Sequence, residues 1–202
     1  MNLRERSKTD KLRRIKAAAR ELFVEQGFDA TTIRQIADRS GVGLATLFLY
    51  ATDKRDLLFL TCNDELAALT DRAFGDVPAD LPFLDQLTVA FRHFFILYAQ
   101  NRTLSRDLLR ELTFVSGGMH GDRFQAIRGS NIARLAGLVD RAKEAGFIEP
   151  LQPSALVGEV IFSVFASEVR KWLAHDTASP EEGVRRLTQL LAVVVVGLRP
   201  TH

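Results

Sequence analysis

The sequence predicts an all-α protein of about nine helices, and three observations support this fold class. Apolar residues recur at three- and four-residue spacing through most of the 202-residue chain, as they do on one face of a helix. Helix caps and breaks that contain Gly or Pro separate these periodic stretches. No stretch shows the alternating Val, Ile and Thr pattern, bounded by turn residues, that is typical of strands.

The first three predicted helices lie close together in the sequence. The first covers about residues 10–26. The second begins after Thr32, which forms a reciprocal cap with Gln35, and ends at Gly41, which takes a left-handed conformation without a Cβ clash. The third, over residues 44–50, is long enough for two turns. Two helices joined by a short turn with glycine form a helix-turn-helix, whose second helix enters the major groove of DNA.

Six further helices are predicted over residues 53–74, 83–99, 104–115, 122–145, 153–175 and 179–198. The last of them contains four consecutive valines, residues 193–196, which by local propensity alone suggest a strand. We predict a helix there, because Ser179 and Glu182 can form a cap with Pro180 at the first helical position.

Charge is distributed unevenly along the chain. The first 20 residues hold eight Lys or Arg and two Asp or Glu, a local charge of +6. The whole chain carries +2, so the other 182 residues carry −4. A basic end on a mildly acidic body is expected of a protein that meets phosphate with one end. We expect a DNA-binding domain over residues 1–55 and a ligand-binding and dimerisation domain over residues 56–202.

Cysteine usage and hydropathy bear on the compartment. The single cysteine, Cys62, excludes an intramolecular disulfide and fits a reducing cytoplasm. We expect no signal peptide, because the first three residues lead straight into charge. The longest apolar run, residues 190–196, is far short of the roughly 20 residues that a membrane span needs. We expect a soluble, cytoplasmic protein without a membrane partner.

The helix-turn-helix also carries a specific pattern of residue types. The pattern comprises Phe23, Gly27, Thr31, Thr32, Ile36, Ala37, Gly41, Val42, Thr46, Leu47, Tyr50, Lys54 and Leu57. With these residues, the first quarter of the chain resembles the DNA-binding segment of the TetR family of transcriptional repressors. The chain departs from the family's pattern at Gly43, where Ser is usual, and at Leu44 and Ala45, where a Lys-Gly-like pair is common. It departs again at Leu49 and Ala51, where a polar residue and Phe are common.

Base readout requires side chains on the exposed face of the second helix of the motif. Leu44, Ala45 and Phe48 are the candidates, and none of them can form a bidentate hydrogen bond with a base. Leu44 or Ala45 can contact a thymine methyl group. Arg34 or Arg39 on the preceding helix can contact guanine or hold a phosphate. In the alternative interpretation, Leu44 or Phe48 packs against the first helix of the motif.

Contacts with DNA phosphates require only a donor near the backbone. Thr32, Thr46, Tyr50 and Lys54 meet this requirement, and the resemblance implies the same role, because matching positions in the family commonly touch the DNA backbone. The alternative for Tyr50 is a buried aromatic residue. A phosphate contact by Lys54 predicts that Lys54→Ala weakens binding to all sequences and lowers the salt slope by about one unit.

Aromatic residues are dense in the predicted body. Most aromatics at helical spacing belong to a core, but pockets between the helices of bundles are typically aromatic with a few polar groups. The candidate ligand-binding residues are Phe91, Phe94, Phe95, Tyr98, Arg110, Phe114, Phe124, Asn131, Phe165, Glu168 and Trp172. The resemblance implies a small molecule that binds here and moves two DNA-reading heads apart.

No catalytic constellation is found in the sequence. The four histidines are scattered, without metal-ligand spacing to Cys or acidic residues, and no Gly-rich phosphate loop is present. We therefore expect no enzyme activity, no metal and no cofactor.

These observations predict a repressor that binds a palindromic operator in double-stranded DNA as a homodimer and is released by a small, largely apolar or aromatic ligand. One short recognition helix contacts few base pairs, so affinity and specificity require a dimer. The last two helices are expected to form the interface through exposed stripes, with Val160, Val164, Leu187, Leu191 and Val194. The alternatives are an all-helical enzyme or lipid-binding module with an incidental helix-turn-helix, and a DNA-binding regulator without a ligand.

Overall fold

The computed structural model describes residues 3–112, 117–149 and 151–198. Over these residues it contains nine α-helices and no strand, which confirms the predicted fold class. No helix in this part of the chain has the length and apolar content that crossing a membrane requires. The chain forms two compact units: the first comprises Met1–Leu66 and Thr103–Ala126, and the second comprises Ala67–Arg102 and Ile127–His202. Helices α4 (Lys54–Gly75) and α7 (Gly121–Glu144) contribute residues to both units.

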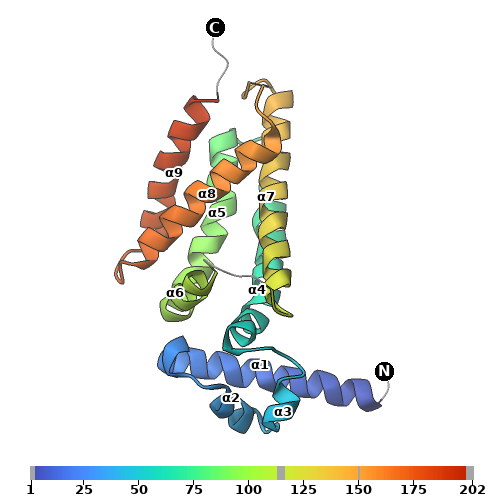
Figure 1. Ribbon diagram of the computed structural model, residues 1–202. Coiled ribbons are helices and arrows are strands. Elements are labelled where there is room, and N and C mark those ends of the chain that lie inside the picture. The colour runs from blue at the N-terminus through green and yellow to red at the C-terminus, as the bar shows by residue number, and fades with distance from the viewer. Residues whose placement is uncertain (1–2, 113–116, 150, 199–202) are drawn as a thin grey trace. The chain divides into compact units, whose positions relative to one another are not determined.

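The first unit is built on α1 (Leu3–Ala30), which begins earlier than the predicted start at about residue 10. Its helical course is interrupted at Gly27, whose φ of 81° and ψ of 167° are not helical. α2 (Ile33–Ser40) packs against α1, and α3 (Leu44–Leu47) packs against α2, as the lower part of Figure 1 shows. α6 (Arg102–Glu111) belongs to this unit from residue 103 onward.

The helix ends of the helix-turn-helix follow from local sequence. The backbone N–H of Gln35 donates to Thr32 Oγ1 at 3.2 Å, and the backbone N–H of Thr32 donates to Gln35 Oε1 at 2.8 Å. Gly41 ends α2 in the left-handed conformation, with φ of 63°. At the start of α4, Asp53 accepts a 2.7 Å hydrogen bond from the backbone N–H of Asp56. The caps predicted at both ends of α2 are therefore present, and Asp53 caps α4.

α3 is shorter than the predicted helix over residues 44–50. It comprises four residues, Leu44–Leu47. The backbone N–H groups of Leu49 and Tyr50 donate to the carbonyls of Thr46 and Leu47, three residues earlier, at 3.1 and 2.8 Å. Hydrogen bonds between residues three apart wind the backbone more tightly than the four-residue bonds of an α-helix. The segment therefore continues as turns after one turn of α-helix.

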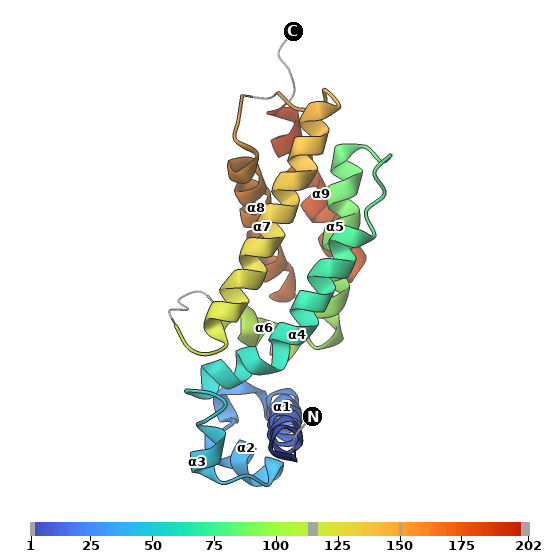
Figure 2. The ribbon, with the colours of Figure 1, turned by 90° about the vertical axis from the view of Figure 1, so that its right-hand side faces the viewer.

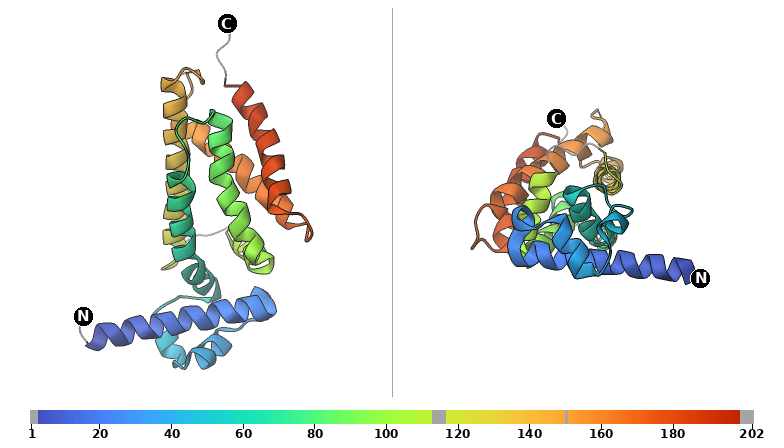
Figure 3. Two further views of the ribbon diagram at one scale, coloured as in Figure 1. Left: turned by 180° about the vertical axis from the view of Figure 1, so that it is seen from behind. Right: turned by 60° about the horizontal axis from the view of Figure 1, so that its bottom comes forward.

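The second unit packs α5 (Phe83–Gln100), α8 (Ser154–Leu173) and α9 (Pro180–Val196) with the remaining parts of α4 and α7. α9 packs against both α5 and α8, which the left panel of Figure 3 shows from behind. The capping box of Ser179 and Glu182 is present at the start of α9. The four valines at 193–196 are helical, which confirms the prediction made against their local propensity.

Two glycines permit close approaches between helices of the second unit. A Cβ at Gly158 of α8 would lie 3.0 Å from the backbone N of Ala136 and from the backbone O of Ile132. α7 and α8 therefore meet at their backbones. Both helices are labelled in Figure 2. A Cβ at Gly183 of α9 would lie 2.4 Å from Cε1 of Phe95 and 2.9 Å from Cδ1 of Trp172. Neither position admits a side chain unless its neighbours move.

Candidate nucleic-acid interface and helical body

The helix-turn-helix presents an apolar face to solvent. Leu44, Phe48 and Leu49 are 39%, 45% and 76% exposed, and Ala45 is exposed as well. Leu47, on the opposite side of this segment, is 0% exposed. Leu44 and Phe48 are therefore surface residues, as the prediction that they contact bases requires.

The polar side chains of the motif differ in whether they already form hydrogen bonds or ion pairs with other residues of the chain. Thr32 is exposed, and its hydroxyl caps α2. Arg39 donates to Glu25 at 2.7 Å, which compensates its charge. Arg34 is exposed and forms no ion pair within the described residues. Thr46 is half-buried. Arg34 is thus the guanidinium of α2 that is available to a base or a phosphate.

The loop before α7 contacts the segment that follows α3. His120 Nε2 lies 2.8 Å from the backbone O of Tyr50, and the backbone N–H of His120 donates to Asp56 Oδ1 at 2.7 Å. Asn63 Nδ2 donates to the backbone O of His120 at 2.9 Å. Asp56 is only 3% exposed and also accepts from the backbone N–H of Thr52 at 2.9 Å. These contacts tie the end of the helix-turn-helix to α4.

Tyr50 itself is half-buried, so it is not an enclosed core aromatic. Its hydroxyl donates to the backbone O of Lys8 at 3.4 Å. This contact brings the basic N-terminal part of α1 to the segment after α3. The role of Tyr50 as a donor to a DNA phosphate stays a prediction.

Lys54, a predicted phosphate contact, is engaged within the first unit. Its Nζ donates to the backbone O of Phe28 at 2.8 Å and of Asp29 at 3.3 Å, and it lies 4.4 Å from the centroid of the Phe28 ring. A cation is favourable near the last carbonyls of a helix. A phosphate contact would have to share or displace these partners, so a structural role competes with the predicted one.

α6 contacts the same end of α1. Asp107, which is 9% exposed, accepts a 2.9 Å hydrogen bond from the backbone N–H of Phe28. Arg110 donates to the two carboxylate oxygens of Asp29 at 2.8 and 3.1 Å. The hydrogen bond with Asp29 raises the pKa of Arg110 above its ordinary value. Arg110, predicted to orient a ligand, therefore lies in the first unit with its guanidinium on Asp29.

Asp64 of α4 joins α1 and α7. It accepts hydrogen bonds from Lys16 and, at 2.6 Å, from Arg123. The bond from Lys16, and then that from Arg123, holds the pKa of Asp64 below its ordinary value. Asp64 is thus paired with two cationic side chains. In the described part of the chain, no three His, Cys, Asp or Glu residues are placed to hold a metal ion.

Five of the predicted ligand-binding aromatics gather in the second unit, around Phe165. The centroid of its ring lies 4.5 Å from that of Phe91, 5.5 Å from that of Phe94 and 6.0 Å from that of Phe95. The Phe95 ring in turn lies 5.0 Å from that of Trp172. None of the five is more than 4% exposed. We call these five residues the aromatic cluster; they come from α5 and α8.

The remaining ligand candidates are distributed over both units. Phe124 belongs to the first unit, where its ring lies 5.6 Å from that of a phenylalanine of α4. Phe114 lies outside the described residues. Tyr98, Asn131 and Glu168 are buried in the second unit. Oδ1 of Asn131 is buried and has no hydrogen-bond partner among the described residues.

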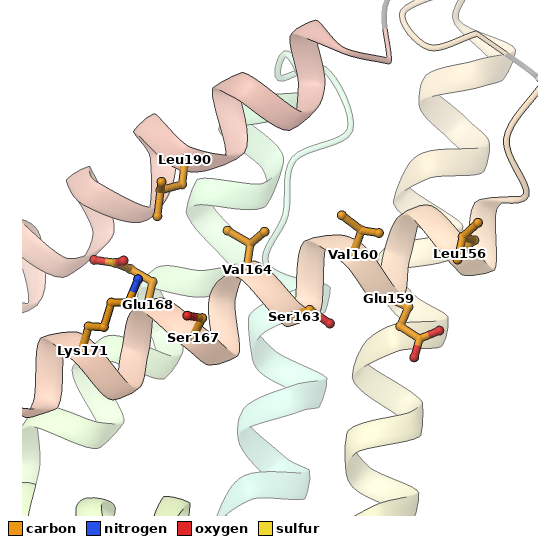
Figure 4. Close-up of a pocket in the computed structure, with 9 residues that line it drawn as sticks. All are labelled: Leu156, Glu159, Val160, Ser163, Val164, Ser167, Glu168, Lys171 and Leu190. Carbon is orange, nitrogen blue, oxygen red and sulfur yellow. The ribbon is translucent and has the colours of Figure 1, made fainter.

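An open groove of about 560 Å³ lies along α8 and α9. Figure 4 shows Val160 and Val164 of α8 on the side that faces Leu190 of α9. Its lining consists of Leu156, Glu159, Val160, Ser163, Val164, Ser167, Glu168, Lys171 and Leu190. The groove therefore combines an apolar floor with charged groups at its sides.

The predicted dimer residues fall into two groups. Val160 is 43% exposed, and Val164 and Val194 are half-buried. Leu187 and Leu191, by contrast, are 1% and 0% exposed inside the second unit, where α9 packs against α5. The prediction that these two leucines lie on an exposed stripe is wrong, because α9 turns that row of its helical period toward the core.

Comparison with known proteins agrees with this geometry. Residues 15–60, which include the helix-turn-helix, match the model of the family described as bacterial regulatory proteins, tetR family. The HTH-type transcriptional regulator HbdR of Aromatoleum sp. (strain CIB) is 26% identical over 179 residues, which cover 87% of this chain and 76% of HbdR. The fatty acid metabolism regulator protein of Bacillus subtilis (strain 168) is 23% identical over 172 residues, which cover 85% of this chain and 88% of that protein.

Solved structures share the fold over nearly the whole chain. FadR of Thermus thermophilus, a TetR family transcriptional repressor solved in complex with lauroyl-CoA, has a TM-score of 0.75 at 21% identity, covering 95% of this chain and 96% of FadR. FadR of Bacillus subtilis in complex with stearoyl-CoA has a TM-score of 0.72 at 22% identity, covering 92% of this chain and 98% of FadR. Residues 15–60 thus carry the DNA-binding segment of the tetR family of bacterial regulatory proteins, and nearly the whole chain is similar in sequence and fold to transcriptional regulators that carry this segment.

Proposed function

We propose that this regulator is a repressor that binds a palindromic operator as a homodimer and is released by a small molecule with an extended apolar part. The observation that carries the proposal is the helix-turn-helix, in which a capped α2 and a left-handed turn at Gly41 precede the exposed face of α3. Thr32, Arg34, Thr46 and Tyr50 are the proposed donors to the DNA backbone. Leu44, Ala45 and Phe48 face the bases.

The shortness of α3 is an argument for a dimer. One α-helical turn contacts few base pairs, so two heads on half-sites about 10 base pairs apart would supply the affinity and specificity of a regulator. The groove along α8 and α9 supports an interface between two copies, since Val160 and Val193 are 43% and 73% exposed on these helices. Large exposed apolar patches mark protein contacts, and these valines lie on two helices that pack against each other. We propose an interface made by Val160, Val164, Leu190, Val193 and Val194.

The aromatic cluster supports an apolar effector. Pockets in helical bundles lie between helices, are lined by aromatic rings and use a few polar groups to orient the ligand. Asn131 supplies a buried oxygen without a hydrogen-bond partner in the same unit. Two structures of the same fold hold lauroyl-CoA and stearoyl-CoA. We therefore propose fatty acyl-CoA thioesters as the effector class to test first.

Two helices connect the second unit, which holds the aromatic cluster, with the first unit, which holds the helix-turn-helix, through a continuous backbone. α4 and α7 each continue without interruption from one compact unit into the other. An effector shifts the balance of two conformations only if it binds one of them better. We propose that the effector favours a spacing of the two heads that the operator does not, and that α4 and α7 transmit the difference.

DNA binding is tested with the full-length protein and fluorescently labelled DNA from upstream of its own gene. We expect specific binding with a footprint of two-fold symmetry and two chains per site. The affinity is expected to fall steeply with salt, by a factor on the order of 10³ between about 50 and 200 mM, because several phosphates are neutralised. Failure to bind at the lower salt concentration would contradict the proposal.

The dimer is tested with Val160→Asp, which places a charge on the groove floor. Sedimentation is expected to show a monomer, and operator affinity is expected to fall on the order of a hundredfold, because the two heads no longer bind as one unit. Val24→Asp makes the same change at another exposed valine, on α1, and is expected to leave the dimer intact. A Val160→Asp protein that remains dimeric would place the interface elsewhere.

The effector class is tested by adding lauroyl-CoA or stearoyl-CoA to the protein–operator complex. We expect both to release the DNA and to raise the melting temperature of the free protein, whereas coenzyme A alone does neither. Neither release nor a thermal shift with either thioester would contradict this effector class. The same result across a broad panel of metabolites would favour a regulator without a ligand.

A further inference from the structure

We propose that the exposed face of α3 recognises the C5-methyl groups of pyrimidines, thymine in particular, in the major groove. This face consists of Leu44 and Ala45 of α3 together with Phe48 and Leu49, which directly follow the helix, and we call it the reading face. The inference rests on the DNA-binding function argued above and names the chemical group that this function uses for specificity.

The backbone places Leu44 and Phe48 of the reading face on one side of the segment. The backbone N–H of Phe48 donates to the carbonyl of Leu44 at 3.2 Å, so these two residues lie one helical turn apart on the same face. Ala45 follows Leu44 on α3, and Leu49 follows Phe48 in the turn after α3; both are exposed. The residues between them turn inward: Leu47 is fully buried, and Thr46 is half-buried.

The reading face is apolar throughout, which excludes the usual form of base recognition. Its four side chains contain no hydrogen-bond donor or acceptor. A bidentate bond to guanine or adenine is therefore not available to them. The thymine methyl is the apolar group that the standard bases present in the major groove, and its neighbours along the edge are polar. An apolar face on a helix that enters this groove is complementary to that group.

Exposure and charge agree on DNA as the partner. Leu49 is 76% exposed, and no described residue of the first unit covers it. The hydroxyl of Tyr50, the next residue, reaches the backbone of Lys8 at 3.4 Å, which brings the basic stretch of α1 to the edge of the reading face. The first 20 residues carry a charge of +6. An apolar face bordered by cations fits a methyl group that lies between two phosphate backbones.

The test uses the full-length protein and an operator obtained by selection from random duplexes that contain thymine. Each thymine of the operator is then replaced by deoxyuridine, which lacks the methyl and keeps the base-pairing edge and the O4 acceptor. We expect the affinity to fall about fourfold for each contacted methyl, the effect of removing one buried carbon of about 0.8 kcal/mol. Equal affinity for the thymine and uracil operators would overturn the inference.

A second arm adds the methyl to another base. At the position most sensitive to uracil, thymine is replaced by cytosine or by 5-methylcytosine, which differ from each other only in the methyl group. We expect the methylated operator to bind about fourfold more tightly than the unmethylated one. No difference between these two operators would contradict methyl recognition at that position.

Protein variants identify the side chain that makes the contact. Leu49→Ala is expected to lose discrimination between thymine and uracil at one position of each half-site and to keep the salt dependence of binding, because no phosphate contact is removed. Val24→Ala changes an exposed apolar residue of α1 and is expected to keep the full discrimination. Unchanged discrimination in Leu44→Ala, Phe48→Ala and Leu49→Ala alike would overturn the assignment to the reading face.

The DNA-binding function and the methyl recognition give different results when they fail. A selection that enriches no DNA would overturn the DNA-binding function together with this inference. A selected operator that binds tightly whether it contains thymine or uracil would leave the regulator function standing and remove the methyl recognition alone.

Discussion

Two sets of contacts, one within each compact unit, join residues that are far apart in the sequence in different ways. In the first unit, residues far apart in the sequence are joined by directional polar bonds, such as Asp107 to the backbone of Phe28 and Lys54 to the carbonyl of the same residue. In the second unit, the aromatic cluster and the fit of Gly183 against it join α5, α8 and α9. Hydrogen bonds fix an orientation, whereas apolar contacts are non-directional. The hydrogen bonds of the first unit thus fix the orientation of the elements around the helix-turn-helix. The apolar contacts of the second unit, which is proposed to bind a ligand, do not require one particular orientation.

The largest effect on stability is expected in the body, from Gly183→Ala. The added Cβ would lie 2.4 Å from a ring atom of Phe95, which is fully buried and cannot move freely. Overpacking of this kind costs about 3 kcal/mol, the upper end of the usual range. Denaturant unfolding measures it. Gly129→Ala on α7 is the control: no atom lies within 4 Å of its Cβ, and a stabilisation of about 0.5–1 kcal/mol is expected. Equal stabilities of the two variants would show that the body does not depend on close fit.

The next effect tests a directional bond in the head. Asp107→Ala removes the acceptor of the Phe28 N–H, and the unpaired donor is expected to cost about 1–3 kcal/mol. Asp107→Asn keeps an acceptor oxygen at the same place and is expected to retain most of this stability. Hydrogen exchange of the Phe28 amide reports the bond directly. If exchange is equally slow in Asp107→Ala, the bond does not hold α6 to α1.

A smaller effect is expected from Lys54→Met. The side chain loses its hydrogen bonds with the carbonyls of Phe28 and Asp29, so the unfolding free energy is expected to fall by about 1 kcal/mol. We expect the salt slope of DNA binding to stay unchanged. A slope lower by about one unit at unchanged stability would instead support the phosphate contact that the sequence predicts.

The smallest effect concerns Asp64, whose pKa is held below its ordinary value of 3.8, first by the hydrogen bond from Lys16. A carboxylate with a depressed pKa in the folded state contributes stability that is complete above the unfolded pKa and is lost as the pH falls through the folded value. Its side chain is 56% exposed, so the contribution is a few tenths of a kcal/mol. Asp64→Asn is expected to be less stable than wild type by that amount at neutral pH. The difference is expected to shrink below about pH 4. A difference that grows in acid would contradict the ion pair.

Features set by neighbouring residues were predictable from the sequence. The capping boxes at Thr32 and Ser179 each depend on a partner three residues away, and both are present. The shortness of α3 was not predictable, because residues 44–50 carry no break that ends a helix. The burial of Leu187 and Leu191 was missed for a related reason. Periodicity shows which residues of α9 share a face, but on a helix that is apolar nearly all round it does not show which face meets the same chain.

The spacing of residues along the chain did not reveal contacts between distant residues. Arg110 meets Asp29 across 81 residues, and His120 meets the backbone of Tyr50 across 70. Neither pair has a spacing that indicates proximity. The sequence feature that bears on the second contact is the adjacent pair Gly117 and Gly118: Gly118 has a φ of 101°, and a Cβ there would lie 3.0 Å from Asp56 Oδ1. Two adjacent glycines before a histidine can thus mark a loop that approaches another segment closely.

Gly158 has a consequence for how this protein can change over evolutionary time. Because α7 and α8 touch at their backbones there, any larger residue would separate two helices along their length. A saturation library is expected to reject nearly every substitution at this position. The rings of the aromatic cluster, by contrast, can be exchanged for other apolar residues of similar volume at modest cost. A lineage could therefore acquire a new effector by exchanging rings, while the helix crossing that supports them stays the same.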